Sequence, residues 1–148
     1  MAETEIPSVP KIWGEERWIA NDGYCGKLLI LKELYQCSIH YHKIKNETFF
    51  ILKGSVLLEI DGKVYFLIPG DVIDVKAGEK HRFTGLENSE IIEFSSHHED
   101  SDSYRDTESK EINSNEAMNL LAMITDNKDY KDRIKTISSY SERKKIVD

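Results

Sequence analysis

Short apolar runs, each closed by a turn signal, fill the region from residue 26 to residue 95. We expect strands in the segments 26–34, 36–42, 47–54, 55–60, 63–68, 71–75, 81–85 and 90–96. Asp61-Gly62 is a tight hairpin signal, because glycine tolerates the positive φ that such turns demand. Closely spaced strands without helices between them are typical of an antiparallel sandwich or barrel, so the predicted fold class is all-β.

The pattern changes after Ser96. Residues 97–111, HHEDSDSYRDTESKE, are polar and should form a surface loop. Ser114 is the expected cap of a helix that carries Met118, Leu121 and Ile124 along one side. A second helical stretch follows, with apolar positions at Tyr130, Ile134, Ile137 and Ile146. Neither helix should be stable alone, so we expect both to pack on the barrel or on a partner subunit.

These patterns divide the chain into three parts. Residues 1–25 are expected to form an N-terminal arm and the first strand, residues 26–98 the barrel, and residues 99–148 the polar loop and helical tail. The whole chain of 148 residues is long enough to bury roughly two-thirds of its unfolded surface.

Charge and composition exclude several classes of function. The net charge of −7 argues against nucleic-acid binding, which needs a basic surface. No apolar run approaches the ~20 residues of a membrane span. The N-terminal residues MAETEIPSVPK do not have the pattern of a signal peptide. Cys25 and Cys37 are too few for a disulfide framework, so we expect a cytoplasmic protein.

Four residues could ligate a metal. Side chains alternate along a strand, so His40 and His42 share a face, and Glu47 opens the next strand. His81 follows a later turn. A histidine pair alone is weak evidence, because strand histidines are usually structural. Three imidazoles and one carboxylate together suit a divalent transition metal (Fe, Mn, Zn, Ni or Co) and leave positions free for water or substrate.

At these positions the sequence resembles the cupin superfamily. The first cupin motif, G-x5-HxH-x3,4-E-x6-G, is matched from His40 to Gly54, although Leu34 stands in place of the leading glycine. The second motif is matched at Gly70, Gly78 and His81, with Lys76 for its proline and Gly85 for its asparagine. The resemblance covers about residues 26–95. It implies a jelly-roll barrel, or double-stranded β-helix, with a short helical C-terminal extension, and the four ligands meeting inside.

The flanking segments resemble a narrower group. Residues 11–31 are similar to the entry into the C-terminal cupin of type II mannose-6-phosphate isomerases: Trp13, Gly14 and Lys27 match, while Ile12 replaces a proline. Residues 89–106 are similar to the closing strand and the acidic, arginine-bearing loop of that group. Small sugar isomerases resembling lyxose isomerase share parts of the pattern.

This resemblance implies aldose–ketose isomerisation of a sugar or sugar phosphate, with a metal-stabilised enediol and a general base. The expected catalytic residues are Glu93, if it shares a face with Ile91 and Ser95, together with Lys45 and Arg105. The expected substrate-binding residues are Lys27, Ser38 and Phe83. For each charged residue the simpler interpretation is an ordinary solvated charge without a role in catalysis or binding.

Two other functions remain open: a non-haem iron dioxygenase of a small substrate, and a sugar- or small-ligand-binding cupin without turnover. His97 and His98 fit a polar loop better than a second metal site, and Trp13 and Trp18 fit packing. The segment 49–52 is apolar on both faces, so a helix of the tail or a second subunit should cover it. We expect a homodimer.

Overall fold

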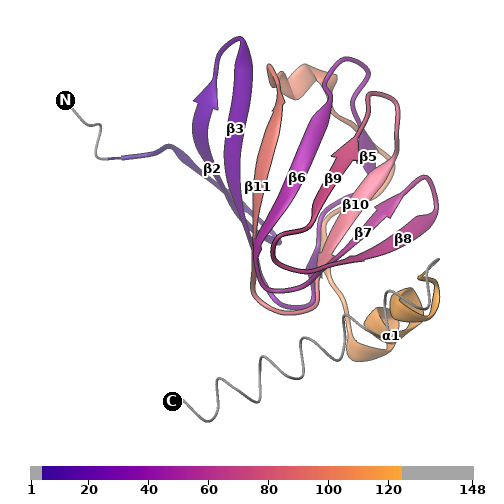
Figure 1. The fold of residues 1–148 in the computed structure, drawn as a ribbon. Helices are drawn as coiled ribbons and strands as arrows, with labels where there is room; N and C mark the ends of the chain where they lie inside the picture. Colours follow the sequence, from indigo (N-terminus) through magenta and orange to yellow (C-terminus); the bar gives the residue numbers. More distant parts are fainter. Residues whose placement is uncertain (1–4, 125–148) are drawn as a thin grey trace.

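Two antiparallel sheets form the molecule (Figure 1). The computed structural model describes residues 5–124, and the second helical stretch expected from the sequence lies outside them. The first sheet is six-stranded, in the order β1-β2-β3-β11-β6-β9. Its strands are β1 Ser8–Lys11, β2 Gly14–Asn21, β3 Tyr24–Leu31, β11 Ser89–Ser96, β6 Glu47–Lys53 and β9 Val72–Val75.

The second sheet is seven-stranded and centres on β10, which pairs with β7, β5 and β4. Its strands are β4 Tyr35–Gln36, β5 His40–Tyr41, β7 Val56–Ile60, β8 Lys63–Leu67, β10 His81–Gly85, β12 Tyr104–Arg105 and β13 Lys110–Glu111. Together the sheets enclose one apolar core, whose buried residues include Leu29, Ile51, Leu58 and Ile91. The all-β jelly roll expected from the sequence is confirmed.

The predicted strands map closely onto the observed ones, with two differences. The run 36–42 is not one strand: β4 ends at Gln36 and β5 begins at His40, and the two pair with β10 at different points. One strand was expected within residues 1–25, and the structure forms two there, β1 and β2. They extend the first sheet beyond β3, and the expected boundary between residues 25 and 26 falls inside β3.

The helix α1, Ser114–Ala122, begins one residue earlier than expected. Its N-cap is Asn113 rather than Ser114, because the Asn113 side chain accepts a hydrogen bond from the Glu116 backbone N–H at 2.9 Å. Met118, expected on the packed side, is 64% exposed. Leu121 and Ile124 are on the packed side as expected, and together with Leu120 they form a satellite cluster with β7 and β8. None of the described helices is long and apolar enough to cross a membrane.

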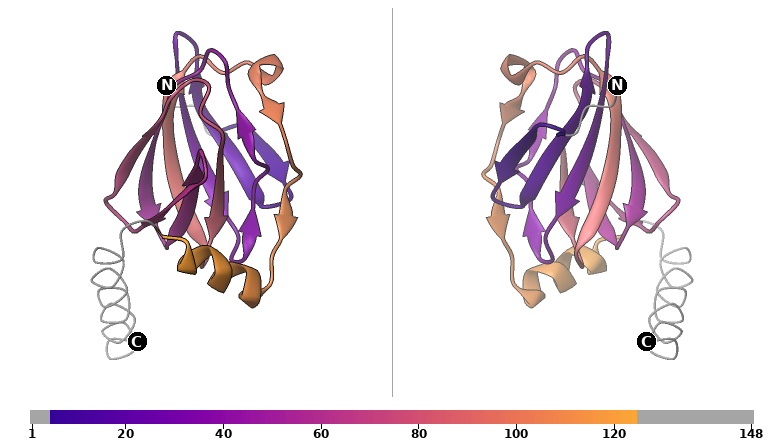
Figure 2. Two further views of the ribbon diagram at one scale, coloured as in Figure 1. Left: turned by 90° about the vertical axis from the view of Figure 1, so that its right-hand side faces the viewer. Right: turned by 90° about the vertical axis from the view of Figure 1, so that its left-hand side faces the viewer.

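The segment after β11 follows the edge of the barrel (Figure 2). A 3-10 helix, η1 Asp100–Asp102, leads into β12, which pairs with β5, and β13 then pairs with β4 above α1. We call residues 98–107 the strap. The Asp106 N–H donates to the Ile39 carbonyl at 2.8 Å, and the Tyr104 ring stacks on Tyr41 with centroids 5.2 Å apart. The expected surface loop is therefore tied to the barrel.

The outward face of the six-stranded sheet is apolar at its centre. Leu28, Ile92, Phe50 and Val72 lie directly opposite one another on four neighbouring strands. We call these four residues the apolar row. Val72 is 61% exposed, and Phe94 beside the row is 56% exposed. α1 packs against β8, and no described helix covers this face. The second expected helix lies outside the described residues, so the expectation for segment 49–52 stays a prediction.

Candidate metal centre

Three histidines meet inside the barrel. His40 and His81 stand opposite each other on β5 and β10, and His42 follows β5 by one residue. Their nearest ring nitrogens lie within 4.8 Å of one another. The structure thus brings together the three imidazoles that the sequence pattern singled out.

Backbone carbonyls fix the protonation of all three rings. Nδ1 of His40 lies 2.8 Å from the Ser38 carbonyl, Nδ1 of His42 lies 3.0 Å from the Asp102 carbonyl, and Nδ1 of His81 lies 3.0 Å from the Glu79 carbonyl. A carbonyl oxygen only accepts hydrogen bonds, so each Nδ1 carries the proton. The Nε2 lone pairs are therefore left facing the centre of the group.

Glu47 completes the set expected from the sequence. Its Oε2 lies 3.0 Å from Nε2 of His81, and its Oε1 lies 3.5 Å from Nε2 of His42. Despite these short distances, Glu47 Oε2 and both Nε2 atoms are buried without a hydrogen-bond partner. Lone pairs facing one another in a buried space cost free energy unless a cation lies between them. The donor set and its orphaned atoms fit a divalent metal ion.

Burial and neighbouring charges set the protonation of these groups. Burial lowers the pKa of His40 to about 3, so this ring is neutral at physiological pH. Burial alone would raise the pKa of Glu47, but contacts with His42 and His81 and the charge of Lys45 outweigh it, and the pKa lies well below its usual value. The neutral imidazole of His40 and the ionised carboxylate of Glu47 are in the forms that bind metal.

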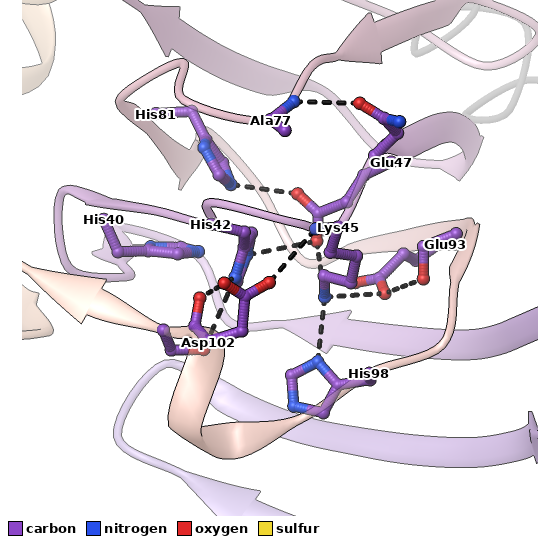
Figure 3. A network of polar contacts seen from close by, with 12 residues as sticks. His40, His42, Lys45, Glu47, Ala77, His81, Glu93, His98 and Asp102 are labelled. Carbon is purple, nitrogen blue, oxygen red and sulfur yellow. Dashed lines mark hydrogen bonds and ion pairs between the residues drawn. The ribbon is translucent and has the colours of Figure 1, made fainter.

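Lys45 lies at the centre of a buried polar network (Figure 3). Its ammonium contacts Glu47 Oε1 at 2.8 Å, His98 Nδ1 at 2.9 Å and Glu93 Oε2 at 3.3 Å. Burial acts to lower the pKa of Lys45, but the charges of Glu93 and Glu47 raise it above its ordinary value. Lys45 is therefore a cation that holds two buried carboxylates together.

Glu93 points inward from β11, on the same face as Ile91. Its carboxyl is buried and accepts a hydrogen bond from the Ser95 hydroxyl at 3.0 Å. Burial, and next the negative charge of Glu47, raise its pKa above the ordinary value of 4.5. A carboxyl group with a raised pKa beside a metal site has the properties of a general base or acid.

Lys27 is the second buried lysine of the pocket. Its side chain is 1% exposed, and its ammonium lies 4.2 Å from the centroid of the Trp18 ring and 3.6 Å from Glu16 Oε2. Within the described residues it makes no hydrogen bond. Trp18, expected to be a packing residue, therefore also covers a charge.

The remaining expected residues also line this pocket. Ser38 is buried, and its carbonyl orients His40. Phe83 forms the apolar side with Trp13, their rings meeting edge to face at 5.0 Å. Arg105 is exposed on β12 at the rim.

Two functional residues were missed by the sequence analysis. His98 was assigned to a polar loop, but its ring is buried and lines the pocket. Asp102 holds His42 through its carbonyl, and its carboxylate accepts hydrogen bonds from the N–H groups of Lys43, Ile44 and Lys45. The cluster of acidic residues around His98 was visible in the sequence, but nothing there indicated that the strap folds back over the site.

Comparisons with known proteins agree with this fold. The family described as "Cupin domain" matches residues 31–94. KdgF from a Halomonas species superimposes with a TM-score of 0.56 at 19% identity, over 59% of this chain and 81% of that chain. A protein from Planctomyces limnophilus gives a TM-score of 0.60 at 19% identity, over 70% of this chain and 96% of that one.

The capsular polysaccharide assembling protein CapF from Staphylococcus aureus gives a TM-score of 0.60 at 19% identity. The match covers 70% of this chain but only 32% of CapF, so the shared part is one portion of a larger protein. None of the curated proteins matches this chain at a significant level. Residues 31–94 therefore match a cupin domain, and the barrel contains a histidine cluster able to bind a metal.

Proposed function

We propose that this protein is a metal-dependent aldose–ketose isomerase that acts on a sugar or sugar phosphate. The observation that carries the proposal is the buried Glu93 carboxyl, which shares the Lys45 ammonium with the metal-site residue Glu47. The Lys45 side chain thus contacts both a residue of the candidate metal site and a carboxyl group whose pKa is raised.

The metal would be held by His40, His42, His81 and Glu47. When bound there it supplies positive charge for the two substrate oxygens, which stabilises negative charge developing on them. Glu93 takes the proton from one carbon of the substrate and returns it to the neighbouring carbon, while the hydroxyl proton passes from one of the two substrate oxygens to the other. Lys45 keeps Glu93 next to the reacting carbons, and Phe83 with Trp13 excludes water from the apolar side.

Lys27 is the proposed contact for an anionic or hydroxyl group of the substrate. Its ammonium is buried with hydrogen-bonding capacity to spare, which favours a ligand oxygen as the partner. Ser38 lines the same pocket, and Arg105 at the rim can bind a phosphate through two parallel hydrogen bonds.

The second candidate is an iron-dependent oxygenase of a small substrate. The observation in its favour is that two of the histidines with Glu47 form the ligand set that non-haem Fe(II) enzymes use. A cupin that binds a sugar without turnover is the third possibility.

The proposal includes a cytoplasmic homodimer. Cys25 and Cys37 are both buried free thiols, which suits a reducing compartment. The apolar row and Phe94 form a partly exposed apolar face, which suits pairing of two copies.

The test is an NMR screen in D₂O with metal-loaded protein and a panel of common aldoses, ketoses and their phosphates. Deuterium should enter the substrate at C1 or C2, with no consumption of O₂. Oxygen uptake without deuterium incorporation would favour the oxygenase. Stabilisation of the protein by a sugar, without any product, would favour the binding module.

A further inference from the structure

His98 lines the pocket together with His40 and His42, and its contacts differ from those of the three clustered histidines. Its Nδ1 lies 2.9 Å from the ammonium of Lys45, and its Nε2 lies 2.8 Å from Oδ1 of Asp100. An ammonium group only donates hydrogen bonds, so Nδ1 of His98 must accept. The ring proton then lies on Nε2 and is donated to Asp100. This tautomer is the reverse of the one that His40, His42 and His81 adopt.

The position of the His98 ring is fixed from several sides. Asn21 holds the backbone of His98 through two hydrogen bonds: its Nδ2 donates to the His98 carbonyl at 3.1 Å, and its Oδ1 accepts from the His98 N–H at 2.8 Å. The ring of His98 meets Trp18 edge to face at 5.2 Å. Such a defined environment is characteristic of a site residue rather than a side chain on a free loop.

The ammonium of Lys45 has three protons and three acceptors: Glu47, Glu93 and His98. The two carboxylates lie on one side of the barrel wall, on β6 and β11, and His98 comes from the strap. Without His98, one proton of Lys45 would be unpaired, and the ammonium would be free to turn between the carboxylates. His98 therefore determines which way Lys45 points.

We propose that His98 is a positioning residue of the site: it accepts a hydrogen bond from Lys45 and thereby holds Glu93 in its reactive orientation. Its role in turnover rests on the proposed isomerase function, whereas its effect on Lys45 does not. His98 is not a metal ligand, because its Nδ1 is occupied by Lys45 and its Nε2 by Asp100.

Three substitutions at His98 distinguish the role of its Nδ1 from that of its Nε2. His98→Asn places an acceptor oxygen close to the position of Nδ1, His98→Gln places its amide close to Nε2, and His98→Phe keeps only the ring. The matched control is His97→Asn, because His97 is the next residue but contacts only Asp22 and Glu99 at the surface. All four variants are made in the full chain and loaded with metal.

The first readout is the ¹⁵N-detected ammonium resonance of Lys45, identified by its loss in Lys45→Met. We expect a slowly exchanging signal in the wild type, in His98→Asn and in His97→Asn, and its broadening or loss in His98→Gln and His98→Phe. Bound metal, measured by elemental analysis, should stay at the wild-type level in every variant. An ammonium signal independent of residue 98, or metal lost with His98, would overturn the proposal.

The second readout is isomerase turnover. His98→Gln and His98→Phe should lower kcat about 10-fold or more with KM changed less than about threefold, since the effect is one of orientation. His98→Asn should restore kcat to within about threefold of the wild type. Equal losses in all three variants would mean a purely structural role and would also overturn the proposal. If the wild type itself does not turn over any sugar, the proposed function fails and the ammonium signal alone decides the role of His98.

Discussion

The backbone carbonyl of Asp102 accepts a hydrogen bond from Nδ1 of His42 at 3.0 Å, while its own carboxylate binds the chain that follows His42. Oδ1 accepts from the Lys43 N–H at 2.9 Å, and Oδ2 accepts from the Lys45 N–H at 3.0 Å. One residue of the strap thus orients a metal-site histidine and fixes the backbone of Lys45.

Removal of the Asp102 side chain should weaken both the fold and the site. Asp102→Ala leaves the N–H groups of residues 43–45 without an acceptor, and we expect a loss of about 2–4 kcal/mol in the free energy of unfolding. Asp102→Asn, which keeps acceptor capacity, should lose less. Urea denaturation of the metal-free proteins measures both values. Equal stability of Asp102→Ala and the wild type would show that the strap does not anchor this loop.

The contribution of the Asp102 charge should depend on pH in a defined direction. Burial alone would raise its pKa, but the three backbone N–H donors lower it below 3.8. A lowered pKa in the folded state means that the stabilisation is fully present above 3.8 and is lost as the pH falls through the lower folded value. The stability difference between the wild type and Asp102→Asn should therefore be constant at neutral pH and should shrink as the pH falls below 3.8.

Substitution of the histidine cluster should abolish metal binding. The wild type should retain about one divalent ion per chain after dialysis. His42→Ala and His81→Ala each remove a correctly protonated donor and should lower the bound metal at least about 10-fold. His97→Ala is the control, because His97 lies outside the cluster. Elemental analysis gives the stoichiometry, and full retention of metal in both cluster variants would contradict the assignment.

Glu93→Gln should stop proton transfer without removing the metal. Glutamine keeps the size of Glu93 and can accept from Lys45, but it cannot take a proton from carbon, so deuterium incorporation should fall by about 10²–10⁴-fold. In the wild type the rate should fall on the acid side with an apparent pKa above 4.5, because burial raises the pKa of Glu93. Unchanged incorporation in Glu93→Gln would assign the base elsewhere.

The apolar row should be the contact between two subunits. Phe50→Glu places a charge in its centre and should shift the protein from dimer to monomer, since a buried unpaired carboxylate is costly. Met118→Glu introduces the same charge at an exposed position on α1 and should leave the dimer intact. Sedimentation velocity at micromolar concentration distinguishes the species. A wild type that is already monomeric would refute the prediction.

Leu34 has a left-handed backbone, with φ of 58°, at the position where the cupin motif has glycine. This conformation costs about 1–2 kcal/mol for a residue with a Cβ atom. Leu34→Gly relieves that cost, so its free energy of unfolding should stay within about 1 kcal/mol of the wild type. Leu52→Gly, on an exposed strand position, has no such compensation and should be clearly less stable. If both variants lose the same free energy, the strain at Leu34 is negligible.

The sequence predicted the histidine cluster because His40 and His81 lie on strands and His42 directly follows one. The two-residue spacing of His40 and His42 favours a shared face, and the turn before His81 brings the third imidazole to it. The same alternation put Glu93 on the inner face with Ile91. For these residues the alternation of side chains along a strand determines both the sequence pattern and the position in the fold.

The strap could not be predicted in the same way. Residues 97–111 have few apolar positions, and polar composition alone indicates a loop. Their position depends on single long-range contacts, such as Asp102 with the backbone of residues 43–45 and Asn21 with His98. These contacts join segments far apart in sequence, and no periodic pattern of apolar residues predicts them. The N-cap was misplaced for a related reason, because Asn113 and Ser114 are both good caps and only the backbone decides between them.

The three imidazoles take their orientation from the carbonyl groups of Ser38, Glu79 and Asp102 rather than from side chains. A carbonyl belongs to every amino acid, so most point mutations at Ser38 and Glu79 leave it in place, whereas Asp102 also anchors the strap through its carboxylate. Genetic drift can therefore alter the neighbouring side chains without turning the rings. A barrel built in this way is free to exchange one substrate for another during evolution while its ligand geometry is inherited unchanged.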